Sequence, residues 1–216
     1  MPVRRLRGIY CYIGRHLEFI AEVLLIIGAS VIVLACPASV SSAFADDAYT
    51  CSTTHGDSAI AACTRAIGSG QYQGHDLAIA YNDRGIEYKN KGDNTDAMAD
   101  FNQAIQIDPQ YAIAFNSRCN IYYTAMNNPD AAIADCTKAI QLNSQYAEAY
   151  FNLGFIYAEN NQIDLAMTNL NKALQIDPSY ALAYKIRGLV ESAKGDTAAA
   201  AADAAKAKQL DPTLGN

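Results

Sequence analysis

Two pairs of residues at one interval are the first candidates for chemistry in this sequence. Arg118 and Cys119 are neighbours, and Asp135 and Cys136 follow seventeen positions later. An arginine and an aspartate can form an ion pair, and two cysteines can form a disulfide or act as thiolates. The doubled interval therefore marks either a reactive site or a pair of structural bonds.

Other residues that support catalysis or metal binding are sparse. His55 and His75 stand apart from each other and from the cysteines, without the spacing of a zinc site. His55 and Asp57 could form a dyad, although a solvated turn fits this context better. We find no Gly-rich phosphate loop, nucleophile elbow or paired-carboxylate motif. The sequence predicts a protein without a metal, a cofactor or enzymatic activity. An enzyme or a metal-binding protein is kept only as a remote alternative.

The first 45 residues differ from the rest of the chain and have the features of a targeting segment. Four arginines lie before or near an uninterrupted apolar run, VLLIIGASVIVLA, from Val23 to Ala35. Ala43 and Ala45 then provide small residues in an A-x-A arrangement. This pattern predicts a signal peptide over residues 1–45 that is cleaved after Ala45.

Two alternatives to a cleaved signal peptide remain open. Residues 33–36 resemble a lipobox, which would place a lipid on Cys36, although Pro37 weakens that reading. The apolar stretch over residues 19–36 is also just long enough to stay in the membrane as an anchor. All three readings place the remainder of the chain in the periplasm or outside the cell, and the lipid and the uncleaved anchor would both hold it at the membrane.

Export affects how the cysteines and the net charge of the remaining chain are interpreted. Four of the six cysteines follow residue 45, and an even number suits a compartment that permits disulfides. Without its four arginines and two glutamates at the N-terminus, the chain has 12 Lys and Arg against 20 Asp and Glu, a net charge of about −8. A basic footprint is absent, so no nucleic acid partner is expected. Membrane contact is expected only through an N-terminal anchor.

From residue 78 onward the sequence repeats itself. Segments 78–111, 112–146, 147–180 and 181–214 each have an aromatic residue at the fourth position, a small residue at the eighth and an alanine late in the second half. Apolar residues recur at helical spacing in both halves, and a Gly-Asp or Asn-rich turn separates the halves. Each segment, called a unit below, is therefore expected to form two helices.

This pattern resembles the tetratricopeptide repeat, a helix-turn-helix unit of 34 residues. The resemblance covers nearly all of residues 78–214 and implies an all-α solenoid, a right-handed superhelix in which neighbouring units bury each other's apolar faces. In this family the concave groove typically holds an extended peptide or a partner helix. We therefore expect a non-catalytic interaction scaffold or adaptor that binds a protein or peptide outside the cytoplasm, or a lipid-anchored adaptor of the same fold.

Transfer of the family's groove positions gives the expected partner-binding residues. They are mostly amide or apolar, and they comprise Ile79, Asn82, Ile86, Asn116, Asn120, Tyr123, Phe151, Asn152, Phe155, Lys185 and Leu189. Their asparagines could hydrogen-bond a peptide backbone without reading its sequence. For the aromatic members, packing against neighbouring units is the alternative. Leu182 and Ile186 occupy places where the family's carboxylate clamp has Lys and Arg, so a C-terminal carboxylate is not the expected ligand.

Comparison of the units explains the first half of the doubled interval. An arginine and an aspartate recur at two equivalent positions in three units, as Arg84 with Asp100, Arg118 with Asp135 and Arg187 with Asp203. In the third unit both change together, to Leu153 and Asn169. Such joint change predicts a structural ion pair between the two helices of a unit. A set of aligned arginines that binds anions is the weaker alternative, because each arginine already has an aspartate at the paired position.

The cysteines of the second unit occupy the next positions along. Other units combine a small and a large residue there, as in Gly85 with Phe101. The helices are expected to come close enough for a disulfide, which predicts a bond between Cys119 and Cys136.

Residues 46–77 are expected to form a partial repeat. The segment DSAIAACTRAIGSG, residues 57–70, matches the second-helix segment DAAIADCTKAIQLN, residues 130–143. Its first helix is missing, so Cys51 is expected to fold back and form a disulfide with Cys63, which would cap the solenoid.

The C-terminal end is alanine-rich, with AAAAADAAKAKQL at residues 198–210. Either these small side chains form an inert end, or the face is a contact for a homodimer or another partner.

Overall fold

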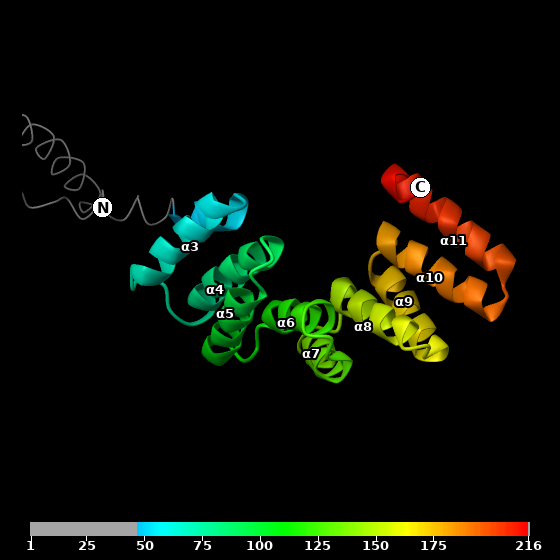
Figure 1. Cartoon of the computed structure of the whole chain (residues 1–216), viewed down its shortest axis with the longest axis horizontal. Helices are drawn as coiled ribbons and strands as arrows, with labels where there is room; N and C mark the ends of the chain where they lie inside the picture. The colour runs from blue at the N-terminus through cyan, green and yellow to red at the C-terminus, as the bar shows by residue number, and fades with distance from the viewer. Residues whose placement is uncertain (1–46, 216) are drawn as a thin grey trace, which may run out of the picture.

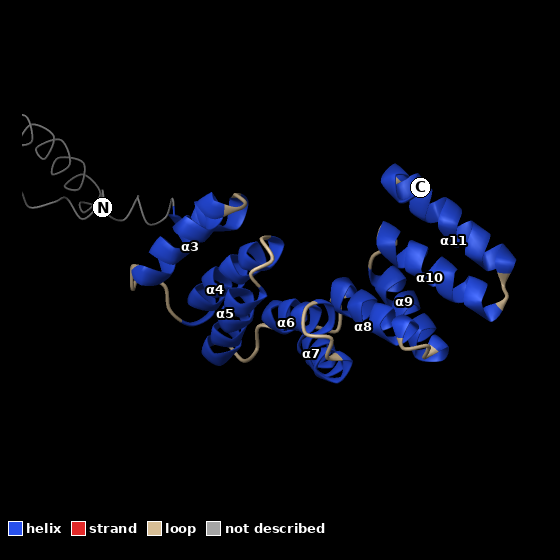
Figure 2. Ribbon diagram, viewed as in Figure 1, coloured by secondary structure: helices blue, strands red, loops and turns tan. Residues whose placement is uncertain are grey.

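The computed structural model describes residues 47–215, and within them the chain is all-α, without a strand (Figures 1 and 2). The expected signal peptide, with its cleavage site, the lipidation site at Cys36 and the anchor, lies outside the described residues. Among the described helices, none is both long enough and apolar enough to cross a membrane.

The helices form consecutive antiparallel pairs along an elongated solenoid (Figure 1). After α3 (Asp57–Gly68), the pairs are α4 (Gly74–Asn90) with α5 (Asn94–Ile107), α6 (Ala112–Thr124) with α7 (Pro129–Leu142), α8 (Ala147–Glu159) with α9 (Ile163–Ile176), and α10 (Ala181–Lys194) with α11 (Thr197–Leu210). A 3-10 turn, Pro212–Gly215, follows. The first helices α4, α6, α8 and α10 also contact one another in sequence, so they form a continuous layer.

The turn inside each pair requires a residue in the left-handed region of backbone space. Every unit supplies a glycine or an asparagine there, namely Gly92, Asn127, Asn161 and Gly195, with φ between 48° and 87°. These residue types adopt this conformation at the lowest cost, and they end the first helix. In three of the turns an Asp or Asn side chain then accepts a hydrogen bond from an amide in the first turn of the second helix.

Small residues allow the two helices of a unit to approach closely. A Cβ atom on Gly85 would lie 2.7 Å from Cε1 of Phe101, and one on Gly154 would lie 2.9 Å from Cγ of Leu170. Phe101 and Leu170 are fully buried. Each glycine thus provides the space that a large side chain of the opposite helix fills.

Each arginine of the repeated Arg-Asp pairs links three helices: its own, the second helix of its unit and the preceding second helix. Arg118 on α6 donates through Nε and Nη2 to the carboxylate of Asp135 on α7, at 2.7 and 2.8 Å, and through Nη1 to Oδ1 of Asn102 on α5, at 2.8 Å. Arg84 and Arg187 bind their aspartates in the same bidentate way and also reach the preceding second helix. Hydrogen bonding to the aspartate raises the pKa of each guanidinium, which outweighs the opposite effect of burial.

The N-terminal end is held to α4 by several bonds. A helical segment that includes residues 47–53 is joined to α3 by a disulfide between Cys51 and Cys63, with 4.7 Å between their Cα atoms. The buried carboxylate of Glu87 accepts a hydrogen bond from the amide of Gly56 at 2.8 Å and lies 3.1 Å from Nδ1 of His55. The segment over residues 47–68 is called the cap below.

Candidate peptide-binding groove

An apolar pocket opens between the first helices α6, α8 and α10. Its volume is about 280 Å³. We call it the aromatic pocket, and its lining residues are Cys119, Asn120, Tyr123, Thr124, Phe151, Asn152, Phe155, Ile156, Leu182 and Ile186. Because three successive units contribute to it, the pocket depends on the stacking of the solenoid rather than on any single repeat.

Three aromatic rings define one side of this pocket. The rings of Tyr123 and Phe155 meet edge to face with centroids 5.7 Å apart, and those of Phe151 and Phe155 lie nearly parallel at 6.3 Å. Phe151 also packs against Tyr180 at 4.8 Å. All four rings are only partly buried. The rings therefore fix each other in place while keeping apolar surface available to a ligand.

Two of the expected groove asparagines are buried instead. Asn82 is 1% exposed and Asn116 is 3% exposed, so neither can reach a ligand in the groove. The amide of Asn116 donates from Nδ2 to the hydroxyl of Tyr146 at 3.2 Å and accepts at Oδ1 from Nδ2 of Asn152 at 2.9 Å. For these two residues the expected role in peptide binding is corrected, because both side chains are buried and that of Asn116 is bonded to other residues of the protein.

The other expected residues are divided among several places. Five of them, Asn120, Tyr123, Phe151, Asn152 and Phe155, lie together in the aromatic pocket. Lys185 and Leu189 line a wider hollow of about 590 Å³ between α10 and α11, where Leu189 is 61% exposed. Ile86 is partly buried against the core around Phe101.

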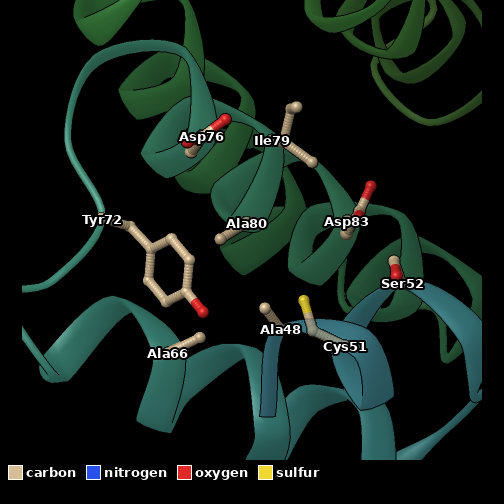
Figure 3. A pocket seen from close by; sticks show the side chains of 9 residues that line it. All are labelled: Ala48, Cys51, Ser52, Ala66, Tyr72, Asp76, Ile79, Ala80 and Asp83. Carbon is tan, nitrogen blue, oxygen red and sulfur yellow. The ribbon is translucent and has the colours of Figure 1, made fainter. Parts of the chain in front are cut away.

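Ile79 lies in a separate pocket at the N-terminal end of the first-helix layer (Figure 3). It has a volume of about 180 Å³, and we call it the cap pocket because the cap forms one wall. Its lining residues are Ala48, Cys51, Ser52, Ala66, Tyr72, Asp76, Ile79, Ala80 and Asp83.

Sequence reasoning missed Asp83 in the cap pocket and Ile186 in the aromatic pocket. Both occupy the sixth position of a unit, as does Asn152, which was expected to line the groove. Their shared position with Asn152 is the sequence signal that could have identified both residues as pocket-lining. From the sequence, Ile186 was expected only to differ from the arginine of the carboxylate clamp. At the first unit, Asn82 and not Asp83 was expected to line the groove.

Acidic groups surround the tyrosines near the aromatic pocket. Burial raises the pKa of Tyr146 and of Tyr180, and the nearby charge of Glu148 adds to this effect in both cases. Burial also raises the pKa of Tyr123, with a further contribution from Glu159. All three phenols therefore stay protonated at neutral pH, next to negative charge.

The described residues offer no alternative metal centre. Over residues 47–215, no group of three or more His, Cys, Asp or Glu side chains is arranged so that it could hold a metal ion. His55 lies against Glu87 rather than forming a dyad with Asp57.

The stacked helix pairs define an α-solenoid of helical repeats. Family models confirm its type: a tetratricopeptide-repeat model matches residues 78–111 and 147–180, and a second model, a TPR repeat, matches residues 123–161. Residues 78–111 and 123–180 therefore consist of tetratricopeptide repeats, as the sequence pattern predicted. This fold supports the role of a protein–protein interaction scaffold, and members of the family are generally non-catalytic.

Solved structures with the same fold are similar over most of this chain. A MamA protein has 26% sequence identity and a TM-score of 0.57, over 72% of this chain and 82% of MamA. PilF of Pseudomonas aeruginosa has 25% identity and a TM-score of 0.59, over 63% of this chain and 64% of its own. YrrB, described as a TPR protein with an unusual peptide-binding site, has 23% identity and a TM-score of 0.55, over 73% and 79%. No curated protein has a matching sequence.

Proposed function

We propose that this chain binds an extended segment of a partner protein along its first-helix layer, with a large apolar side chain of the partner in the aromatic pocket. The observation that carries the proposal is the pocket itself. It has about 280 Å³ of open space lined by partly exposed Tyr123, Phe151 and Phe155. Desolvated pockets lined by aromatic residues are where protein interfaces concentrate their binding free energy.

The polar groups at the pocket suit a peptide backbone. The side chains of Asn120 and Asn152 are partly exposed among the apolar lining. Asn152 donates a hydrogen bond from Nδ2 to Asn116, and this internal bond fixes the orientation of the Oδ1 atom of Asn152. An asparagine that is held in place can accept a hydrogen bond from a main-chain amide without selecting the partner's side chains. YrrB, which shares the fold, is described as having a peptide-binding site.

A binding assay with a matched control tests this proposal. Peptides selected from a displayed library on the purified, disulfide-bonded chain should bind Phe155→Ala about tenfold more weakly, because a ring at the centre of an apolar contact contributes about 1.4 kcal/mol. Leu165→Ala is the control, because Leu165 is also a large exposed apolar residue, at 47%, but lies on the second helix α9. Equal binding by Phe155→Ala and the unaltered chain would reject the aromatic pocket as the site.

We further propose that the scaffold works outside the cytoplasm. Both disulfides support this location, because such bonds persist in oxidising compartments. The targeting features of residues 1–45 point the same way. Cell fractionation and mass spectrometry of the exported protein test it: cleavage after Ala45 supports a free protein, whereas acylation of Cys36 supports the lipid-anchored adaptor. A homodimer through the C-terminal helix α11 stays a prediction, which size-exclusion chromatography with light scattering checks.

A further inference from the structure

The cap pocket combines an apolar floor with a negatively charged rim. Asp76, Ile79 and Asp83 follow one face of α4 at positions i, i+3 and i+7, and Ala80 lies beside them. The ring of Tyr72 leans over the pocket from the loop between α3 and α4 (Figure 3). A side chain with an apolar stem and a cationic end matches this arrangement, because its stem can cover the floor while its charge meets the carboxylates.

Asp76 and Asp83 have no cationic partner among the described residues. The ion pairs over residues 47–215 involve other acids, including the aspartates that bind Arg84, Arg118 and Arg187. The pKa of Asp83 is raised, first by burial and then by the negative charge of Glu87, although a hydrogen bond with Asn82 acts in the opposite direction. The same acidic field contributes to Tyr111, whose pKa is raised to about 12 by burial and by the charges of Asp83 and Asp108.

A cation in the cap pocket would therefore remove an existing electrostatic cost. The three buried aspartates, Asp100, Asp135 and Asp203, each have an arginine at 2.7 to 2.8 Å, whereas Asp83 is partly buried. Asp83 lacks one within the protein, and its neighbourhood opens into a pocket rather than into the core. The missing positive charge is the feature that identifies the ligand.

We propose that the cap pocket binds an arginine or lysine side chain of the same partner segment that places an apolar side chain in the aromatic pocket. This inference rests on the proposed function and adds the chemistry of the partner. The first helices α4, α6 and α8 contact in sequence, and packed helices lie about 8–10 Å apart, so the two pockets are roughly 20 Å apart. At about 3.3 Å per residue, an extended partner has its basic residue about six positions from its apolar residue.

The shape of the cap pocket depends on the disulfide between Cys51 and Cys63. Ala48, Cys51 and Ser52 form one wall, and the disulfide between Cys51 and Cys63 joins that wall to α3. Reduction, or replacement of both cysteines by serine, releases the wall from its covalent attachment. The aromatic pocket lies on other helices and does not depend on this bond.

The first test uses N-acetyl-arginine amide as the probe, added to the full, disulfide-bonded chain and followed by amide chemical shifts. We expect shifts at Ala48, Ala80 and Asp83, and none with the uncharged citrulline analogue. Asp83→Asn should weaken binding about threefold, the effect of losing one partly exposed charge partner. Asp130→Asn is the control, because Asp130 is an exposed acid in the first turn of α7. Shifts spread over all acidic residues, or equal binding of citrulline, would overturn the inference.

The second test separates this inference from the proposed function. Its probe is an acetylated and amidated Gly-Ser peptide with one Arg and one Phe six positions apart, in both chain orders, and with citrulline in place of Arg. Arginine-dependent affinity that is lost in Cys51→Ser/Cys63→Ser, with Phe binding retained, supports the cap pocket. Binding that depends on Phe155 but not on the peptide's arginine rejects the cap pocket alone. Absence of any dependence on Phe155 rejects the proposed function as well.

Discussion

The second and third units solve one packing problem with different chemistry. In the second unit, Arg118 binds Asp135, and Cys119 is joined to Cys136 with 5.5 Å between their Cα atoms. The difference shows that close contact between the two helices is what the fold requires. The kind of bond at that contact is free to vary.

The third unit makes the same contact by packing alone. Leu153 replaces the arginine and is 6% exposed, and Gly154 faces the fully buried Leu170. Asn169 replaces the aspartate, and its Nδ2 donates to the carbonyl of Leu165 in its own helix instead of crossing to α8. Both units line the aromatic pocket, together with α10 of the fourth unit, so the pocket has one wall from a unit with a covalent bond and one from a unit held by apolar contact.

The largest expected effect comes from removing the disulfide of the second unit. Cys119→Ser/Cys136→Ser should lower the free energy of unfolding by on the order of 3 kcal/mol, because a bond that closes a loop of this length restricts the unfolded chain. Cys119→Gly/Cys136→Leu copies the third unit, and it should recover part of the loss because leucine fills the space. Urea unfolding measures both. Equal stability of the two variants would show that packing cannot substitute for the bond.

The repeat register made the contacts between paired helices predictable from sequence. Once the units are aligned, Cys119 falls opposite Cys136 and Gly154 opposite Leu170, and the structure brings both pairs into contact. Five of the ten residues that line the aromatic pocket were expected from the groove positions of the tetratricopeptide-repeat family, transferred through the same alignment. Such contacts recur with the period of the chain, so one unit provides information about the others.

Features that depend on neighbouring units or on irregular segments could not be predicted in this way. Asn116 is buried where it contacts Tyr146, the last residue of its own unit, and Asn152 in the next unit. The second partner of Arg118, Asn102, lies in the preceding unit. The cap pocket requires the path of a segment that has no counterpart among the repeats.

A smaller effect is expected from breaking the ion pair of the second unit. Arg118→Leu should cost about 2 kcal/mol, because it leaves Asp135 buried without its partner, in a pair that keeps some access to solvent. Arg118→Leu/Asp135→Asn reproduces the third unit and removes the uncompensated charge. The double variant should therefore be more stable than the single variant in urea unfolding. The opposite order would mean that Asp135 stabilises the protein through something other than its pair with Arg118, because both variants lose Arg118 and its contact with Asn102.

The smallest effect is expected from adding one methyl group to the third unit. In Gly154→Ala the new Cβ would lie 2.9 Å from Cγ and 3.1 Å from the backbone nitrogen of Leu170, so the helices must move apart. Overpacking of this kind costs about 1–3 kcal/mol, and the higher helix propensity of alanine offsets up to about 1 kcal/mol. A net loss of about 1 kcal/mol in urea unfolding is expected. Gly68→Ala is the control, because Gly68 is also helical but a Cβ there meets no atom within 4 Å, so that variant should be neutral or stabilising. Equal behaviour of the two variants would show that the third unit, lacking the covalent bond of the second, adjusts its helix spacing freely.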